Sequence, residues 1–235
     1  MVAFVTKTNK IGRRHSIKTV SCDKLCVVIA GDKVSKRRLN KKLARFGNDI
    51  IVSPSFTTIS SRFSGDEFKT QLLFKAFCEF VNSASLKYSV GILDNDGQFL
   101  KDVGEILPKA KSLSVCSLID TEPLLSDCIK DFGVAPEVSS SVDVLDGVDV
   151  VFAPGGFYGQ CKFLFGEGGL LPSAERFPLP DYCALAVSLG ADRLELAALL
   201  SAEEPLLSIE GLVPEFLQKG QEVYRLSTIE KTHKY

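Results

Sequence analysis

Between residues 88 and 153 the sequence alternates short apolar runs with longer segments of helical periodicity. The apolar runs are rich in β-branched residues and are bounded by polar turns, which is typical of buried strands. Strands that alternate with helices form a parallel sheet, because each helix carries the chain back to the start of the next strand. We therefore predict an α/β fold with a mostly parallel sheet and helices on both faces. The predicted strands are 88–93, 112–119, 135–138 and 148–153, and the predicted helices are 99–110 and Glu122–Phe132.

An earlier part of the chain predicts a second, smaller lobe. Two apolar runs, 25–30 and 49–54, flank an amphipathic helix predicted over 34–46, and a strongly periodic helix is predicted over 66–82. We expect the two lobes to meet just before the alternating segment. The predicted division is a basic α/β lobe at residues 1–85 and a larger α/β domain at 86–235, which ends in helices near 180–202 and 213–223.

The composition is that of a folded globular chain, because 45% of the 235 residues are hydrophobic and 24% are charged. Charges interrupt every apolar run before it reaches the roughly 18 residues that span a bilayer. The first residues lack the apolar core of a secretory signal, so we expect a cytoplasmic protein without a membrane segment. The seven cysteines are scattered and the two histidines lie near the ends, which predicts reduced thiols and no structural metal site.

Charge is distributed unevenly along the chain. Residues 1–50 hold 13 Lys and Arg against 3 Asp and Glu, although the net charge of the whole chain is −1. Much of this excess lies on one face of the helix predicted over 34–46. That helix lacks interleaved aromatic residues, and the chain lacks the net positive charge of most nucleic-acid proteins, so we do not expect a nucleic-acid partner. We expect the helix to neutralise acidic surfaces of the same chain or of a second copy in a homo-oligomer.

Three predicted strands end in segments that can hold a nucleotide. YSVGILDNDG carries the turn at 94–97, SLSVCSLID carries Asp120, and DGVDVVFAPGG carries Pro154, Gly155 and Gly156. Over residues 87–157 this pattern resembles the Rossmann-like dinucleotide-binding proteins, such as the shikimate dehydrogenase-like enzymes. The resemblance implies an NAD(P)-like nucleotide at these strand ends, with Asp120 on a ribose hydroxyl. A helix-capping role for Asp120 is the alternative, because a helix is predicted to begin beside it.

The first of these turns departs from that family. Rossmann-like proteins place G-x-G-x-x-G there, so that bare backbone approaches the pyrophosphate, whereas this chain has DNDG at 94–97. Two carboxylates at that point repel a pyrophosphate. We therefore expect Asn95, Gly97, Asp120 and the 154–156 turn to hold a ligand in a protein that is not an ordinary NAD-dependent dehydrogenase.

The same turn also resembles the first motif of the haloacid dehalogenase-like phosphohydrolases, four apolar residues followed by D-x-D-G. The resemblance implies that Asp94 is a nucleophile and Asp96 a general acid, both facing one Mg²⁺, because alternate residues at a strand end project from the same side. Gln98 departs from that motif. The later acidic residues, Asp143, Asp146 and Asp149, precede the strand at 150–153 where the family places such residues after it. An ordinary solvated turn has the same sequence, so both interpretations stay open.

The carboxyl ends of parallel strands are where ligands of open α/β sheets bind, and residues 155–172 place six glycines after such an end. Our leading prediction is a small anionic or nucleotide-like ligand between the basic lobe and the strand ends that carry residues 94–97, Asp120 and 154–156. The alternatives are a Mg²⁺-dependent phosphohydrolase that uses Asp94 and Asp96, and a non-enzymatic assembly or regulatory protein. Whether the chain is an enzyme stays open.

Overall fold

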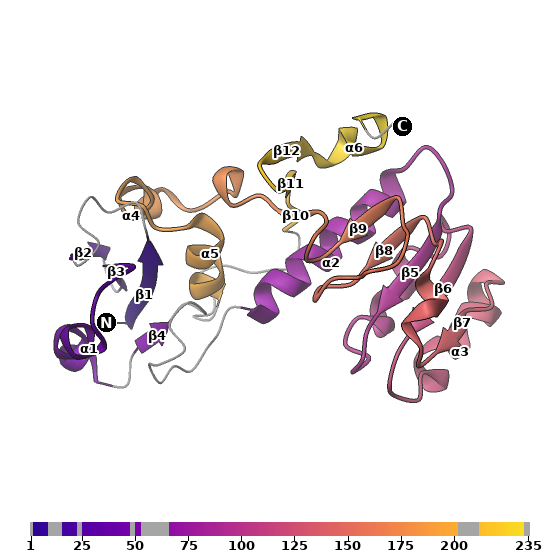
Figure 1. Cartoon of the computed structure of the whole chain (residues 1–235), viewed down its shortest axis with the longest axis horizontal. Helices are drawn as coiled ribbons and strands as arrows, with labels where there is room; N and C mark the ends of the chain where they lie inside the picture. Colours follow the sequence, from indigo (N-terminus) through magenta and orange to yellow (C-terminus); the bar gives the residue numbers. More distant parts are fainter. Residues whose placement is uncertain are drawn as a thin grey trace. The chain divides into compact units, whose positions relative to one another are not determined.

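The computed structural model describes residues 2–8, 16–22, 25–47, 50–52, 66–201 and 212–232. The chain forms two compact units, whose elements are labelled in Figure 1. Unit 1 comprises Met1–Lys69 and Ala174–Leu212, and unit 2 comprises Thr70–Ser173 and Val213–Tyr235. The predicted boundary after residue 85 differs from this division, which falls inside helix α2 (Asp66–Ser83) and gives unit 1 a second stretch of chain.

Unit 1 is built on a four-stranded sheet of order β2-β3-β1-β4. The central strand β1 (Val2–Thr8) pairs in parallel with β3 (Leu25–Gly31) and with β4 (Ile50–Val52). On the far side of β3, β2 (Ile17–Cys22) runs antiparallel to it. The sequence analysis placed the first strand at 25–30, whereas that segment forms the third strand. Strand β1 was missed because its apolar run, residues 2–5, is short and is followed by polar and basic residues.

Both faces of the unit 1 sheet are covered, so every residue of β3 is buried. Cys26 and Val28 pack with Leu39 and Leu43 from α1 (Lys36–Leu43), which continues into the 3-10 turn η1 (Ala44–Phe46). The alternate residues Val27 and Ile29 pack on the opposite side. Their partners come from α4 (Ala184–Ser188) and α5 (Arg193–Ser201). The single helix predicted near 180–202 is therefore two helices, separated at Gly190, whose φ of 97° is unfavourable for other residues.

Unit 2 contains a five-stranded sheet of order β7-β6-β5-β8-β9, and every pairing within it is parallel. The strands form at the predicted places but are shorter than predicted. The fifth strand, β9, lies inside the segment that the sequence analysis treated as a glycine-rich loop. The strands are β5 (Ser89–Leu93), β6 (Ser112–Cys116), β7 (Glu137–Ser139), β8 (Val150–Phe152) and β9 (Phe163–Phe165).

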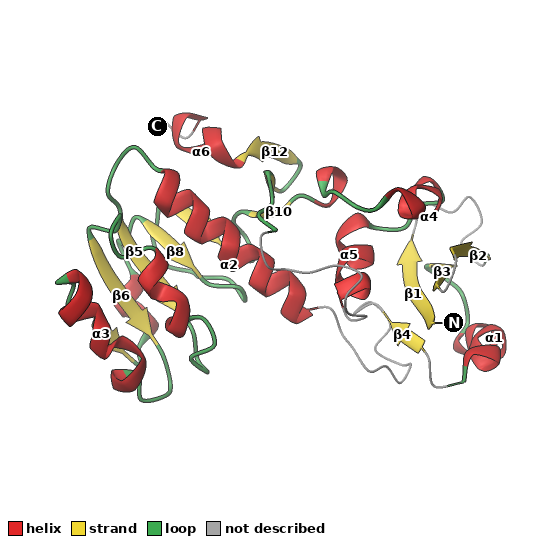
Figure 2. Ribbon diagram, turned by 180° about the vertical axis from the view of Figure 1, so that it is seen from behind, coloured by secondary structure: helices red, strands yellow, loops and turns green. Residues whose placement is uncertain are grey.

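The α-helices of unit 2 lie on one face of this sheet. Figure 2 shows α2 and α3 (Glu122–Phe132) on the same side of the strands, and the ring centroids of Phe77 on α2 and Phe152 on β8 are 5.5 Å apart. The opposite face packs against Leu145 of the 3-10 turn η3 (Val142–Leu145). The prediction of helices on both faces therefore holds only in part. The segments that cross this second face, 140–149 and 153–162, are at the short end of the roughly 10–12 residues that a helical crossover needs.

Two further predicted helices of unit 2 take other forms. The segment at 99–110 contains only the 3-10 helix η2 (Leu100–Glu105), because Gly104 and Pro108 disfavour a regular α-helix. The helix predicted over 213–223 is wrong. That segment is an antiparallel hairpin of β11 (Phe216–Lys219) and β12 (Glu222–Arg225), which turns at Gly220 with φ 61°.

β11 also pairs with β10 (Leu171–Pro172), and the chain then continues through η6 (Leu226–Thr228) into α6 (Ile229–Thr232). Leu217, Leu226 and Ile229 from this segment join the core that α2 and the parallel sheet share. Across the described parts of the chain, every helix is too short or too polar to cross a membrane.

Candidate functional site

The predicted site residues follow neighbouring strands of the unit 2 sheet. β5 lies at the centre, with β6 on one side and β8 on the other, and all three run in the same direction. The turn at 94–97 follows β5, and Pro154, Gly155 and Gly156 follow β8. Because parallel strands end at the same edge, the fold brings the 94–97 and 154–156 turns to one edge of the sheet.

The Asp94 carboxylate is turned back onto the chain that follows it. Its Oδ1 accepts a hydrogen bond from the backbone N–H of Gly97 at 3.1 Å, and its Oδ2 accepts from Phe99 at 2.7 Å and from Leu100 at 3.0 Å. Only 3% of Asp94 is exposed. These donors belong to the start of η2, where backbone N–H groups have no partner within the helix. Asp94 therefore serves as the cap of η2.

The turn itself depends on Gly97, whose φ of 75° is in the left-handed region that favours glycine. Asp96 is exposed, and its Oδ1 accepts a longer hydrogen bond, 3.3 Å, from the backbone N–H of Gln98. Asn95 is also exposed. Of the four turn residues, the two that point outward are therefore Asn95 and Asp96.

Burial raises the pKa of the Asp94 carboxyl. The backbone N–H groups of Phe99 and Leu100 oppose the rise, and the neighbouring Asp96 carboxyl adds to it. A nucleophilic aspartate needs an ionised oxygen that can reach phosphorus. Both Asp94 oxygens already accept hydrogen bonds from the backbone, so the geometry fits a structural turn better than a nucleophile or a Mg²⁺ ligand. Among the side chains that the structure describes, no three His, Cys, Asp or Glu residues converge on a metal-sized position.

The same geometry bears on dinucleotide binding. The backbone N–H groups that start the first helix of such a sheet are the donors that a pyrophosphate uses. Here the Asp94 carboxylate accepts three of these hydrogen bonds. The turn therefore does not fit the binding of an ordinary pyrophosphate, because the N–H groups that would bind it already donate to Asp94.

Asp120 lies farther from the sheet than predicted. β6 ends at Cys116, so Asp120 belongs to the loop that leads into α3, and it is exposed. The residue that directly follows the strand is Ser117, whose Oγ donates to the carbonyl oxygen of Asp94 at 2.6 Å. Its own N–H donates to the carbonyl of Ser139 at 3.0 Å. Ser117 ties the ends of β5, β6 and β7 together, a role that the sequence analysis missed because a single serine carries no distinctive pattern.

Close backbone packing explains part of the glycine-rich segment. A Cβ on Gly166 would lie 1.8 Å from the carbonyl oxygen of Ala153, and one on Gly169 would lie 2.2 Å from that of Leu164. Gly166 lets the turn after β9 approach the end of β8, and Gly169 lets that turn fold back onto β9. Gly155, in contrast, is exposed, and a Cβ added to it would meet no atom within 4 Å. Gly155 is therefore open to a ligand, as is Gly168, whose added Cβ would likewise meet no atom within 4 Å.

The edge carries acidic residues and exposed apolar side chains but no cation. The segments 94–97, 117–121, 153–161 and 166–169 contain no Lys or Arg. In the loop beside Asp120, Leu118 is 71% exposed and Ile119 is 42% exposed. The site thus offers carboxylate and amide groups together with apolar surface, and it offers little attraction to a free anion.

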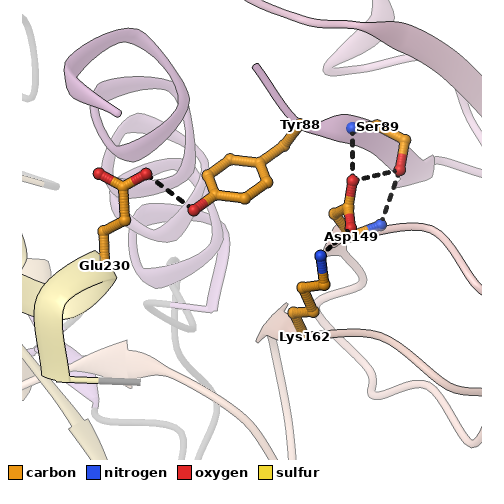
Figure 3. Close-up of polar contacts among 5 residues, drawn as sticks. All are labelled: Tyr88, Ser89, Asp149, Lys162 and Glu230. Atoms are coloured by element: carbon orange, nitrogen blue, oxygen red, sulfur yellow. Dashed lines mark hydrogen bonds and ion pairs between the residues drawn. The ribbon is translucent and has the colours of Figure 1, made fainter. Parts of the chain in front are cut away.

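Two other polar networks tie unit 2 together away from this edge (Figure 3). At the start of β5, Ser89 donates from its N–H and its Oγ to Oδ2 of Asp149, at 2.9 and 2.8 Å. The Lys162 ammonium lies 2.7 Å from the other oxygen of Asp149. These contacts join the starts of β5, β8 and β9. They were not predicted from the sequence, because the three residues are far apart along the chain.

The second network anchors the C-terminal segment. The Glu230 carboxylate on α6 accepts a hydrogen bond from the hydroxyl of Tyr88 at 2.8 Å (Figure 3). It also accepts hydrogen bonds from the N–H and Oγ of Ser85, both at 2.9 Å. The N–H of Leu86 donates to it at 3.3 Å. Both networks serve to hold segments of unit 2 in place.

None of the six cysteines whose side chains the structure describes forms a disulfide, and five of these side chains are buried. Burial is the main cause that raises the pKa of Cys78 to about 12, so this thiol stays protonated at neutral pH. The burial of five side chains agrees with the expectation for these thiols, and their reduced state stays a prediction. It also gives Cys78 no nucleophilic character.

Comparison with known proteins leaves the family open. No family model matches the chain, and no curated protein matches it. Among solved structures, L-tryptophan dehydrogenase from Nostoc punctiforme is 14% identical, with a TM-score of 0.31 over 60% of this chain and 50% of that one. The match thus spans about half the length of that dehydrogenase. A likeness of this size carries no argument about function, so the α/β assignment rests on the strand pairing of the chain itself.

Proposed function

We propose that unit 2 binds a nucleotide-like ligand through its sugar and base at the edge formed by the 94–97 and 154–156 turns. The strand order carries this proposal. The chain runs outward from β5 through β6 to β7, and then returns to the other side of β5 to form β8 and β9. This is the order of the first five strands of a Rossmann-like sheet, whose ligands bind where the direction of strand addition reverses.

The chemistry of the edge favours the uncharged part of such a ligand. Asn95, Asp96 and Asp120 are exposed and provide acceptors for hydroxyl groups. Leu118, which is 71% exposed, provides apolar surface against which a planar base can pack. A small anion has less support, because Asp94 already accepts the hydrogen bonds of the turn and the edge carries no Lys or Arg. We infer that the protein is not an ordinary NAD-dependent dehydrogenase.

A thermal-shift comparison of adenosine, AMP, NAD and inorganic pyrophosphate tests the proposal. A ligand at 100 times its dissociation constant stabilises a protein by about 2.7 kcal/mol, which gives a clear shift. We expect adenosine and its nucleotides to raise the midpoint and pyrophosphate alone to leave it unchanged. Leu118→Ser should remove the shift, whereas Leu86→Ser, at a residue that is 63% exposed, should retain it. A panel without any shift, or a shift with pyrophosphate alone, would contradict the proposal.

The phosphohydrolase alternative has weaker support, because it needs Asp94 to leave the three hydrogen bonds that it accepts. Its test is the hydrolysis of p-nitrophenyl phosphate with Mg²⁺. An activity that Asp94→Asn abolishes, while the circular dichroism spectrum stays native, would favour the phosphohydrolase over the ligand-binding proposal.

A further inference from the structure

We propose that the solvent-facing side of α1 in unit 1 is a docking surface for the phosphate backbone of nucleic acid. This surface comprises six basic residues: Lys36, Arg37, Arg38, Lys41, Lys42 and Arg45. All six are exposed, and α1 contains no acidic residue. The inference concerns a different unit and different residues from the ligand site proposed above.

The fold orders these cations into rows. Leu39 and Leu43 are each 2% exposed and pack against Val28 of the unit 1 sheet, which fixes the rotation of the helix. Residues four apart lie above one another on a helix. Arg37 and Lys41 therefore form one row, which Arg45 of η1 extends, and a second row of Arg38 and Lys42 lies beside it. The row of Arg37 and Lys41 is on the side opposite the buried leucines, and the row of Arg38 and Lys42 lies along the flank of the helix.

The charges at the start of α1 do not serve the stability of the helix, whereas Lys41 and Lys42 in its last turn complement the helix dipole. Lys36, Arg37 and Arg38 occupy its first turn, where positive charge opposes the helix dipole. Like charges four residues apart also repel each other along both rows. The polar group that caps this end, the Ser35 Oγ, accepts a weak hydrogen bond of 3.4 Å from the Arg38 N–H. A partner with dense negative charge would relieve this repulsion.

The density of charge favours a nucleic acid over other partners. At 1.5 Å per residue, Arg37 to Arg45 spans about 12 Å, so its five cations lie on average about 3 Å apart along the axis. Duplex DNA carries one phosphate charge per roughly 1.7 Å of its axis. Three of the five cations are arginines, whose planar guanidinium groups can bind phosphate oxygens in pairs. The Arg45 guanidinium is held 4.6 Å from the centroid of the Phe46 ring, which orders that end of the row.

Two other partners fit less well. A membrane-binding helix needs apolar side chains that can enter the lipid, but Leu39 and Leu43 are committed to the core. On a second copy of the chain, the exposed carboxylates of the unit 2 sheet edge, such as Asp96 and Asp120, lie singly in separate loops. At that edge of unit 2 the carboxylates therefore do not form a row that matches the cations of α1. The prediction that the basic helix has no nucleic-acid partner rested on its lack of interleaved aromatic residues and on the net charge of the whole chain. Binding of a duplex through its phosphates needs no aromatic stacking and depends on the local charge.

The test is fluorescence anisotropy of the full chain with a labelled 20-bp duplex of arbitrary sequence, over 50–200 mM salt. If five phosphates are neutralised, log K falls against log salt with a slope of about −4.5, so affinity drops by roughly 500-fold over this range. The double variant Arg37→Gln/Lys41→Gln should reduce the slope by about 2. The matched control Lys109→Gln/Lys111→Gln removes two exposed lysines from unit 2 and should keep the wild-type slope.

Thermal melting of the α1 variant shows whether it is folded. Because the substitutions remove like charges that repel each other, its melting midpoint should equal or exceed that of the wild type. The proposal is overturned if the wild type fails to bind duplex at 50 mM salt, or if the control variant loses as much affinity as the α1 variant. It is equally overturned if α1 variants change only the binding to vesicles of anionic lipid, or only the mass of the protein on a sizing column.

Discussion

Replacing Asp94 by alanine should destabilise unit 2 strongly, although Asp94 lies in a turn. The variant leaves the N–H groups of Gly97, Phe99 and Leu100 without their acceptor. A helix-capping side chain is worth about 0.5–2 kcal/mol, and each buried donor left unpaired costs about 1–3 kcal/mol. Because the adjoining turn is exposed and water can satisfy part of this loss, we expect a total near the low end, about 3 kcal/mol. Urea denaturation followed by circular dichroism measures it.

The control is Asp96→Ala, which removes an exposed carboxylate with one hydrogen bond of 3.3 Å to Gln98. Exposed substitutions of this kind change stability by about 0.5 kcal/mol or less. Asp94→Asn keeps one acceptor oxygen and should fall between the two alanine variants. If Asp94→Ala unfolds with the same free energy as Asp96→Ala, the capping role assigned to Asp94 is refuted.

The pH dependence provides a second readout of Asp94. Its pKa is raised from the ordinary value of 3.8, mainly by burial. A carboxyl whose folded-state pKa is raised contributes stability that is fully present below the unfolded pKa and is lost as pH rises through the folded pKa. The amide of Asp94→Asn does not titrate. The destabilisation caused by Asp94→Asn should therefore be smaller at pH 7 than below pH 4.

Other parts of unit 2 give three further expectations. Gly169→Ala should abolish the native fold of the β8–β9 region, because its Cβ would lie 2.2 Å from the Leu164 carbonyl oxygen. The control Gly155→Ala should melt like wild type. Equal melting of the two variants would contradict this. The pKa of Glu230 is lowered, since hydrogen bonds from Ser85 and Tyr88 outweigh the effect of burial. The anchoring of α6 should therefore be present above the ordinary pKa of 4.5 and weaken as pH falls through the folded-state pKa. Hydrogen exchange at the Leu86 N–H measures this. The pKa of Asp149 is likewise lowered, because Lys162 and Ser89 outweigh the effect of burial, so Lys162→Met should raise this pKa. An unchanged titration of the Asp149 carboxyl by NMR would show that the ion pair does not affect its pKa.

The turns of the candidate site could be placed from the sequence, but the contacts of their side chains could not. The apolar runs marked the strands, and the rule that parallel strands end at one edge placed the 94–97 and 154–156 turns together. The direction of the Asp94 side chain could not be predicted from the sequence, because a D-x-D-G sequence is compatible with a nucleophile, a solvated turn or a helix cap. Only the folded turn, in which Gly97, Phe99 and Leu100 donate to Asp94, decides among these.

Local periodicity determined the helices that have a clear amphipathic pattern in the sequence. α3 has the bounds predicted from its apolar spacing, Glu122–Phe132, and the predicted basic helix corresponds to α1 and η1. Tertiary structure decided the conformation of short segments that are stabilised chiefly by contacts with neighbouring elements. The β11–β12 hairpin replaced a predicted helix because Leu217 is fully buried in the core of unit 2 and cross-strand pairing supplies the backbone hydrogen bonds. The strand order was likewise decided by pairing between residues far apart in the chain, which no local pattern encodes.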